Sequence, residues 1–313
     1  MEKILFLLDS PCDLLEEQIK DLDIRIIPVT VTVGEETRLD YYEVDRVAFW
    51  KELAALPIPP VTAMAPLELW IEEFRKAKED GYTHVIVAPV SSTSAGTLNA
   101  VTIARDLFNE DHSGGLVIEI VDLKSYSYVY GRIGLQGALM AKDGAPFAEI
   151  VEYMNEIAPR AQALLWVYSL LNLKKSGRIS GMSAFVGETL GLRPILWIRG
   201  GLISPVERVR GDKNIVPKII EMSKDYIVAP NEQDMVLMYS DVPEEEIARA
   251  EKMILDEIRP RSLKRHPIGA AIAINSGPQS MALLFTGKPV FEPSVATETT
   301  DATEATGAAE AAD

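Results

Sequence analysis

The sequence contains few of the residues that most often carry metal or thiol chemistry. Its 313 residues include one cysteine, Cys12, and three histidines. A single cysteine excludes an internal disulfide framework and fits a reducing compartment, so we expect a cytoplasmic protein. The three histidines form no His-x-x-x-His or Glu-x-x-His spacing, and we therefore expect no metal site.

Long apolar runs and an excess of positive charge are also missing. No stretch of about 20 apolar residues occurs, which argues against a transmembrane helix. The opening "MEKILFLLDSP" is too short and too acidic for a signal peptide and is more typical of a first strand. The chain carries 31 basic and 47 acidic residues, a net charge of −16. This balance disfavours nucleic acid and anionic membranes, so we expect no nucleic-acid partner and no stable membrane insertion.

Standard catalytic and nucleotide-binding motifs are absent as well. The chain has no Gly-x-Ser-x-Gly nucleophile elbow. The stretch "GETLGLRP" lacks the Gly-Lys-Ser/Thr of a P-loop, and no Gly-x-Gly-x-x-Gly follows the first expected strand. Nucleotide binding through a standard motif is therefore poorly supported.

Strand-like runs alternate with helical patterns through the first half of the chain. The apolar runs "KILFLL", "THVIVAPV" and "LVIEIVDL" are separated by segments with helical spacing, and "IRIIPVTVTV" is expected to form a second strand. Gly81 stands where a helix C-cap belongs, after "LELWIEEFRKAKED". This alternation predicts an α/β fold with a parallel, doubly wound sheet.

The second half predicts a mixed or antiparallel α/β domain. "RPILWI" and "LISPVERV" are joined by a short glycine-rich turn, which is typical of a hairpin, and "IGAAIAI" and "MALLF" are expected to be further strands. We place the boundary near Pro159, which gives an N-terminal domain over 1–159 and a C-terminal domain over 160–288. Residues 289–313 are rich in Ala, Thr and Glu, and we expect a disordered acidic tail.

Polar residues gather where three of the expected strands end. They are Asp9 with Ser10, the run from Ser91 to Thr97, and Asp122 with Ser125 and Ser127. Ligands of doubly wound sheets bind beyond the carboxyl ends of the strands. Thr97 can cap a helix that begins at Leu98, and a helix N-terminus suits an anion. The alternative is a hydroxyl-rich turn and helix cap without a ligand.

Two basic segments stand out in this acidic chain. Arg178 lies in "LKKSGRIS", and Arg208 and Arg210 lie in "ERVRGDK". Such residues could shape the mouth of a pocket or dock an acidic partner. The alternatives are a structural ion pair for Arg178 and plain solvated charge for the other two.

Several motifs follow one another in a specific order along the chain. They are "DSPCDL", "IPVTV", "PPVTAMAP", "SSTSAGT", "IVDLKSYS", "LKKSGRIS", "LRPIL", "VRGDK" and "GAAIAINSGP". In this order they resemble the DegV family of bacterial fatty-acid-binding proteins, from about Lys3 to Phe285. Each motif alone is modest, and the ordered set is fairly specific.

The resemblance implies a two-domain α/β protein with a long-chain fatty acid buried in a tunnel at the domain interface. In the family, a threonine and a serine of the first domain hold the carboxylate, and a histidine of the last loop approaches it. Several members present the acid to a separate fatty acid kinase subunit, which phosphorylates it for phospholipid synthesis. The resemblance therefore implies a non-catalytic binding protein with no cofactor other than its bound fatty acid.

The site residues transfer position by position. Thr62, Gly96 and Thr97 match the family pattern, whereas Ala95 stands at the family serine and Asn275 at the family histidine. Ser94 is one position from the expected serine. The expected ligand-binding residues are Thr62, Ser94, Ala95, Gly96, Thr97, Ser127, Asn275 and Ser276. The expected mouth or partner-surface residues are Arg178, Arg208 and Arg210.

Two other functions remain open from the sequence. One is a phosphotransferase subunit resembling dihydroxyacetone kinases, a class that attaches its substrate through a histidine where this chain offers Asn275. The other is a divergent scaffold whose ligand is altered or lost because side chains fill the pocket. Tyr126, Tyr128, Val129 and Met64 favour that second alternative.

Overall fold

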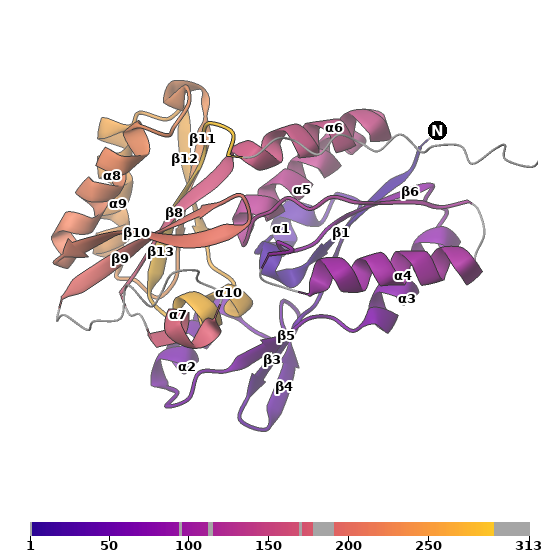
Figure 1. Cartoon of the computed structure of the whole chain (residues 1–313), viewed down its shortest axis with the longest axis horizontal. Coiled ribbons are helices and arrows are strands. Elements are labelled where there is room, and N and C mark those ends of the chain that lie inside the picture. Colours follow the sequence, from indigo (N-terminus) through magenta and orange to yellow (C-terminus); the bar gives the residue numbers. More distant parts are fainter. Residues whose placement is uncertain (1, 94–95, 112–114, 169–170, 178–190, 291–313) are drawn as a thin grey trace, which may run out of the picture.

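A four-stranded parallel sheet forms the centre of the first part of the molecule (Figure 1). The computed structural model describes residues 2–93, 96–111, 115–168, 171–177 and 191–290. The strand order is β2-β1-β6-β7, with every neighbouring pair parallel. Their bounds are Ile4–Asp9 for β1, Ile24–Ile27 for β2, His84–Ala88 for β6 and Val117–Ile120 for β7. This is the doubly wound sheet that the alternation of strands and helices predicts.

Helices cover both faces of this sheet. Leu5 and Leu7 of β1 pack toward α3 and α4, whereas Phe6 and Leu8 pack toward α5 and α6. The helices span Leu67–Glu79 (α3), Thr97–Asp111 (α4), Tyr128–Lys142 (α5) and Phe147–Ile157 (α6). Gly131 allows α5 to approach the first turn closely, because a Cβ there would lie 2.1 Å from the Cys12 carbonyl oxygen. Both faces of the sheet are therefore covered by helices, as in parallel sheets generally.

A six-stranded mixed sheet forms the second part, which the chain enters through the short turn Ala158–Arg160. Its order is β10-β9-β8-β13-β11-β12, and every pair is antiparallel except β11 with β12. The strands span Ala161–Val167 (β8), Leu192–Arg199 (β9), Leu202–Arg210 (β10), Asp234–Tyr239 (β11), Ser262–Pro267 (β12) and Ser280–Thr286 (β13). The predicted β9–β10 hairpin is present.

Two long helices cover one face of the mixed sheet. They are α8, over Ile215–Lys224, and α9, over Glu244–Glu257. Trp166 and Phe285 are buried beneath them, whereas Leu165 and Leu284 point to the opposite face, toward the first half of the chain. The mixed sheet therefore has two buried faces, and its inner face meets the parallel sheet's helices.

A small third sheet corrects one expectation. The run "IRIIPVTVTV" is not one strand, because Pro28 lacks an N–H and separates β2 from β3. The new sheet has the order β4-β3-β5, with bounds Thr30–Val33 for β3, Glu36–Leu39 for β4 and Val61–Ala63 for β5. Two further helices are Glu16–Ile19 (α1), between β1 and β2, and Arg46–Ala55 (α2), between β4 and β5.

A second expectation was wrong for "IGAAIAI". This segment forms helix α10, over Ala270–Ser276, instead of a strand, and it packs against the short helix α7 over Leu171–Ser176. A short apolar run cannot by itself distinguish a buried strand from a buried helix. Buried carboxylates of Asp13 and Asp40 accept hydrogen bonds from the Gly269 and Ala271 amides, which favours the helix here. In the described ranges, no helix is long and apolar enough to cross a membrane.

Candidate functional site

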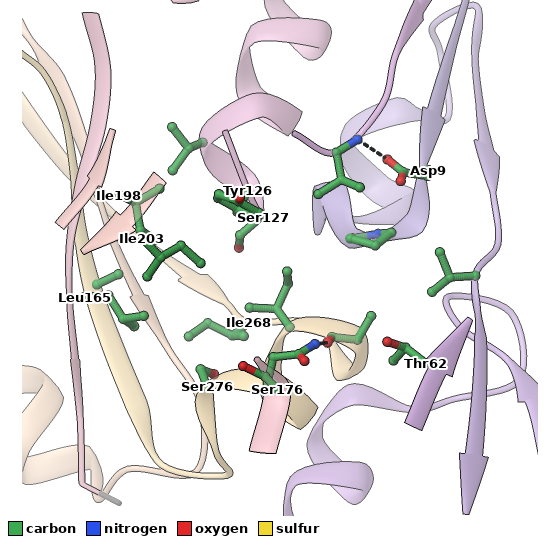
Figure 2. A pocket seen from close by; sticks show the side chains of 18 of the residues that line it. Asp9, Thr62, Tyr126, Ser127, Leu165, Ser176, Ile198, Ile203, Ile268 and Ser276 are labelled. Carbon is green, nitrogen blue, oxygen red and sulfur yellow. Dashed lines mark hydrogen bonds between the residues drawn. The ribbon is translucent and has the colours of Figure 1, made fainter. Parts of the chain in front are cut away.

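A cavity of about 280 Å³ lies between the parallel sheet and the inner face of the mixed sheet. Figure 2 shows Asp9 and Thr62 on one side of it, and Leu165, Ile198 and Ile203 on the opposite side. Its volume is near the lower end of the roughly 300–1,000 Å³ that small-molecule pockets occupy. The cavity therefore has the size and the position of a ligand site.

Most of the cavity wall is aliphatic, and the strand period explains why. Side chains alternate between the faces of a sheet, so Ala163 and Leu165 of β8 face the cavity together with Ala282 and Leu284 of β13. These residues are direct cross-strand partners, Leu165 with Ala282 and Ala163 with Leu284. Such a wall suits a hydrocarbon chain.

Six of the expected ligand-binding residues line this one cavity. They are Thr62, Gly96, Thr97, Ser127, Asn275 and Ser276. Ser94 and Ala95 lie outside the described residues. The six come from four separate segments of the chain, so the fold brings together positions that are up to 214 residues apart in sequence (62 to 276).

Thr62 and Thr97 present hydroxyl groups to the cavity. Thr62 is the middle residue of β5, paired with Val31, and Thr97 is 1 % exposed. Helix α4 begins at Thr97 and not at Leu98, so Gly96 takes the capping position and its carbonyl accepts from the Ala100 amide at 3.0 Å. Within the described part of the chain, no hydrogen bond holds either hydroxyl group. Both can therefore receive or donate a hydrogen bond to a ligand.

The other expected polar groups already have partners. The Ser127 hydroxyl donates to the Asp13 carboxylate, and the Asn275 amide donates to the Ala271 carbonyl at 2.8 Å. The Ser276 hydroxyl lies 3.1 Å from that of Ser280. These side chains border the cavity, but binding a ligand head group would require them to share or exchange these bonds.

The basic residues are placed elsewhere. Arg178 lies outside the described residues. Arg208 and Arg210 are exposed on the edge strand β10 and border a separate, open surface hollow with Lys218 of α8. Neither lines the cavity. Arg208 and Arg210 therefore do not line the mouth of this cavity, and their other expected role, a surface for a partner, stays a prediction.

Asp9, the last residue of β1, is a cavity-lining residue that the sequence-based site omits. It is fully buried, and its Oδ1 accepts hydrogen bonds from the Val90 amide at 2.9 Å and from the Tyr130 hydroxyl at 2.7 Å. Burial, and to a lesser extent the nearby Asp40 carboxylate, raises the pKa of Asp9 to about 6. The sequence did offer one signal for Asp9, because it lies with Ser10 among the polar residues at the ends of the expected strands.

A buried polar network fixes the segment from His266 to Ile268, where the cavity-lining residues before α10 begin, to the first half of the chain. The His266 Nε2 lies 2.7 Å from the Asp13 carbonyl oxygen, which makes Nε2 the protonated nitrogen, and the ring stacks on Tyr128 at 3.7 Å. Burial lowers the pKa of His266 to about 4 and raises that of the Asp13 carboxyl to about 7. The Trp50 indole N–H adds a 3.0 Å hydrogen bond to the Ile268 carbonyl.

The turn of the β9–β10 hairpin contacts the polar segments that follow β6 and β7 of the parallel sheet. The Gly201 carbonyl accepts hydrogen bonds from the hydroxyls of Tyr126, at 2.7 Å, and Thr93. Tyr126, Ile198 and Ile203 all line the cavity, so this contact lies at its wall. Tyr126 and Val129 do occupy cavity-wall positions, as the divergent-scaffold alternative requires, but a cavity of about 280 Å³ remains between the sheets. Tyr128 packs on His266 instead.

Comparison with known proteins places these features in one family. The family model described as "Uncharacterised protein, DegV family" matches residues 3–288. A DegV domain-containing protein of Caldanaerobacter subterraneus subsp. tengcongensis is 28% identical over 288 residues, covering 92% of this chain and 100% of that protein. One from Clostridium perfringens is 28% identical over 289 residues, covering 91% and 99%.

Solved structures share the fold. A DegV lipid-binding protein of Thermotoga maritima has a TM-score of 0.80 at 22% identity, covering 92% of this chain and 99% of that one. A stearic-acid-binding protein of Eubacterium ventriosum has a TM-score of 0.81 at 23% identity, covering 92% and 99%. A fatty-acid-binding DegV family protein of Thermus thermophilus has a TM-score of 0.81 at 22% identity, covering 91% and 99%. These likenesses confirm the two-sheet α/β architecture.

Proposed function

This chain belongs to the DegV family, and from that premise we propose that it binds a long-chain fatty acid or a similar amphiphile in the cavity between its two larger sheets. The observation that carries the proposal is the cavity itself, with aliphatic walls and two hydroxyl groups at Thr62 and Thr97. Solved relatives described as fatty-acid-binding proteins, one of them loaded with heptadecanoic acid, support the same ligand class.

The aliphatic part of the cavity wall suits the acyl chain of such a ligand, and the hydroxyl groups suit its head group. Each buried CH₂ contributes roughly 0.8 kcal/mol, so the acyl chain supplies most of the binding free energy along Leu165, Ile198 and Leu284. A buried carboxylate needs hydrogen-bond donors. The Thr62 and Thr97 hydroxyls and the N-terminal turn of α4, with Ser94, Ala95 and Gly96 beside it, are proposed to supply them. Asn275 and Ser276 are proposed to border the head group.

We further propose that the protein is a non-catalytic carrier without another cofactor. In this scheme residues 1–159 and 160–288 are the two domains that enclose the acid, and a fatty acid kinase subunit phosphorylates it. Arg208 and Arg210 of β10, with Arg178, are the proposed docking residues for an acidic surface of that kinase. The dihydroxyacetone-kinase alternative gains no support from Asn275, whose amide is bonded to its own helix.

Lipid extraction and mass spectrometry of the purified protein test the binding proposal. We expect a co-purifying acyl chain, or uptake of added oleate by stripped protein. In Ala282→Leu the larger side chain fills part of the cavity, so bound lipid should decrease, whereas Ala248→Leu on the exposed face of α9 should bind as before. A folded protein that neither carries nor takes up any acyl chain would refute the proposal.

The kinase partnership has its own assay. Acyl phosphate formation is measured with a fatty acid kinase, ATP and the loaded protein. The Arg208→Glu, Arg210→Glu double variant should lower the rate at least several-fold. Arg261→Glu, directly before β12 at the opposite edge of the same sheet, reverses one basic charge and should leave the rate unchanged. Equal rates for the two variants would remove the β10 surface from the proposal.

A further inference from the structure

One oxygen of the Asp9 carboxyl group is buried without a partner. Oδ1 accepts the two hydrogen bonds from Val90 and Tyr130, but Oδ2 is buried from solvent and has no hydrogen-bond partner among the residues that the structure describes. Asp9 also lines the cavity, where Figure 2 shows it on the same side as Thr62. Buried carboxylate oxygens normally have donors, so this one marks a place where a donor or a proton is required.

The surroundings of Asp9 do not neutralise it. The titratable groups that face it are Tyr130 of α5, Asp40 after β4, and Cys12 in the turn after β1. The positive charge of Arg46, on α2, lowers the pKa of Asp13 and of Asp40. Its guanidinium group donates hydrogen bonds to backbone carbonyls, including that of Asp13 at 2.9 Å. Among the described residues that line the cavity, none is Lys, Arg or His.

An ionised fatty acid would therefore enter a cavity that already holds a carboxylate. Two like charges in a low-dielectric site cannot both stay ionised at low cost, and the usual result is one proton shared between them. Burial already moves the pKa of Asp9 up to about 6, so protonation near neutral pH is inexpensive.

We propose that Asp9 is a ligand-binding residue whose protonated Oδ2 donates a hydrogen bond to the carboxylate of the bound fatty acid. This inference rests on the proposed function and specifies its head-group chemistry. At pH 8 free Asp9 and the free acid are both ionised, and the complex holds one proton taken from solvent. A long-chain alcohol follows the other route, because its hydroxyl donates to ionised Oδ2 and no proton is taken up.

The pH dependence of binding follows from this proton. Above the pKa of Asp9, affinity for a fatty acid falls about tenfold for each pH unit, because one proton is bound with the ligand. Affinity for the alcohol has no such slope. The cavity thus selects carboxylic acids in a proton-linked manner and accepts neutral hydroxyl head groups without that linkage.

Calorimetry with soluble probes tests the inference. Dodecanoate and 1-decanol are titrated into stripped protein at pH 8 in two buffers that differ in ionisation enthalpy. We expect uptake of about one proton for dodecanoate and none for decanol. Dodecanoate binding without proton uptake overturns this inference alone. Failure of both probes to bind at any pH overturns the proposed function and this inference with it.

An isosteric variant assigns the proton to Asp9. Asp9→Asn keeps an acceptor for Val90 and Tyr130 and places an amide N–H₂ at the Oδ2 position, so proton uptake should disappear and dodecanoate affinity at pH 8 should equal or exceed that of the wild type. Glu119→Gln changes a half-buried carboxyl on β7 that does not line the cavity, and it should keep the one-proton uptake. Unchanged proton uptake in folded Asp9→Asn overturns the proposal, and if that variant does not fold, the proton count of the wild type decides.

Discussion

The Tyr126 hydroxyl donates a 2.7 Å hydrogen bond to the carbonyl oxygen of Gly201. Tyr126 follows β7 of the parallel sheet, whereas Gly201 forms the turn between β9 and β10 of the mixed sheet. The bond therefore joins the two halves of the molecule directly beside the cavity that the tyrosine ring lines. Moving the hairpin turn away from the parallel sheet requires this bond to break.

The first prediction concerns ligand release. Tyr126→Phe keeps the ring in the cavity wall and removes the hydrogen bond to Gly201 together with the 3.0 Å bond to the Thr93 hydroxyl. The bond between the two halves is worth about 0.5–1.5 kcal/mol, so release of a fluorescent fatty acid should accelerate roughly two- to tenfold. Stopped-flow displacement measures this rate. Tyr42→Phe is the matched control, because Tyr42 also donates to a backbone carbonyl, that of Ile26, but lies outside the cavity. Equal release rates in all three proteins would mean that this bond does not limit release.

The second prediction concerns the space at Gly201. This glycine has φ +81°, and a Cβ would lie 2.8 Å from Thr93 Cγ2 and 2.9 Å from Ser91 Oγ. Gly34 has a similar φ of +62° with nothing within 4 Å. Both alanine variants bear a backbone cost of about 1–2 kcal/mol, and Gly201→Ala should lose about 1–3 kcal/mol more in urea unfolding. Equal losses would show that the hairpin turn moves aside freely.

The third prediction concerns acid sensitivity through His266. Its folded pKa of about 4 lies below its unfolded value of 6.5, so the unfolded chain binds the proton first and this residue lowers stability as pH falls from about 6.5 to about 4. Asp9 and Asp13 act oppositely, because their folded values of about 6 and 7 exceed the unfolded value of 3.8. They make stability rise as pH falls through about 7 to 4.

His266→Gln separates these opposing contributions. The variant should be less stable than the wild type at pH 7, where it loses the stacking on Tyr128. Between pH 7 and pH 5 its stability should nevertheless change more favourably than that of the wild type, by on the order of 1–2 kcal/mol, because only the His266 contribution is removed. Urea unfolding at both pH values measures the difference. An identical pH dependence in the two proteins would mean that His266 stays neutral in the unfolded state too, which its ordinary pKa forbids, or that its folded pKa is not lowered.

The fourth prediction concerns the proposed head-group site. Thr97→Val removes the buried hydroxyl and keeps the branched shape, so fatty acid affinity should fall by about 1.5–3 kcal/mol, roughly ten- to a hundredfold, if the hydroxyl bonds a carboxylate. Thr102→Val is the control on the same helix, because its hydroxyl bonds the Leu98 carbonyl away from the cavity. Equal affinities in the two variants would remove Thr97 from the head-group site.

Much of the fold could be predicted because the relevant signals are local. The alternation of apolar runs and helical spacing identifies the parallel sheet, and Gly200 with Gly201 identifies the β9–β10 hairpin. The segment after Gly269 could not be assigned in this way, since its helix depends on contacts with Asp13 and Asp40, more than two hundred residues earlier. Strand β12 was missed because "SLKRHP" is a polar edge strand without the apolar alternation that predicts strands.

Part of the candidate site could also be predicted, because some of its residues lie in recognisable local motifs. Thr62, Thr97 and Asn275 were found through ordered motifs, and the fold gathers them around one cavity. Asp9 was visible only as a polar strand end, because its burial and its unpaired oxygen arise from Val90 and Tyr130, which lie on other elements. A sequence shows residue types in order, whereas desolvation depends on which distant elements surround a group.

The strands β8 and β13 separate the cavity from the core of the second domain, and each of their two faces packs against one of them. Ala163, Leu165, Ala282 and Leu284 face the cavity, and Leu164, Trp166, Leu283 and Phe285 face the helices on the other side. Mutation can therefore reshape the cavity by exchanging every second residue, while the alternate residues keep the mixed sheet packed against α8 and α9. The shape of the cavity can thus be altered by substitution without redesign of the rest of the mixed-sheet domain.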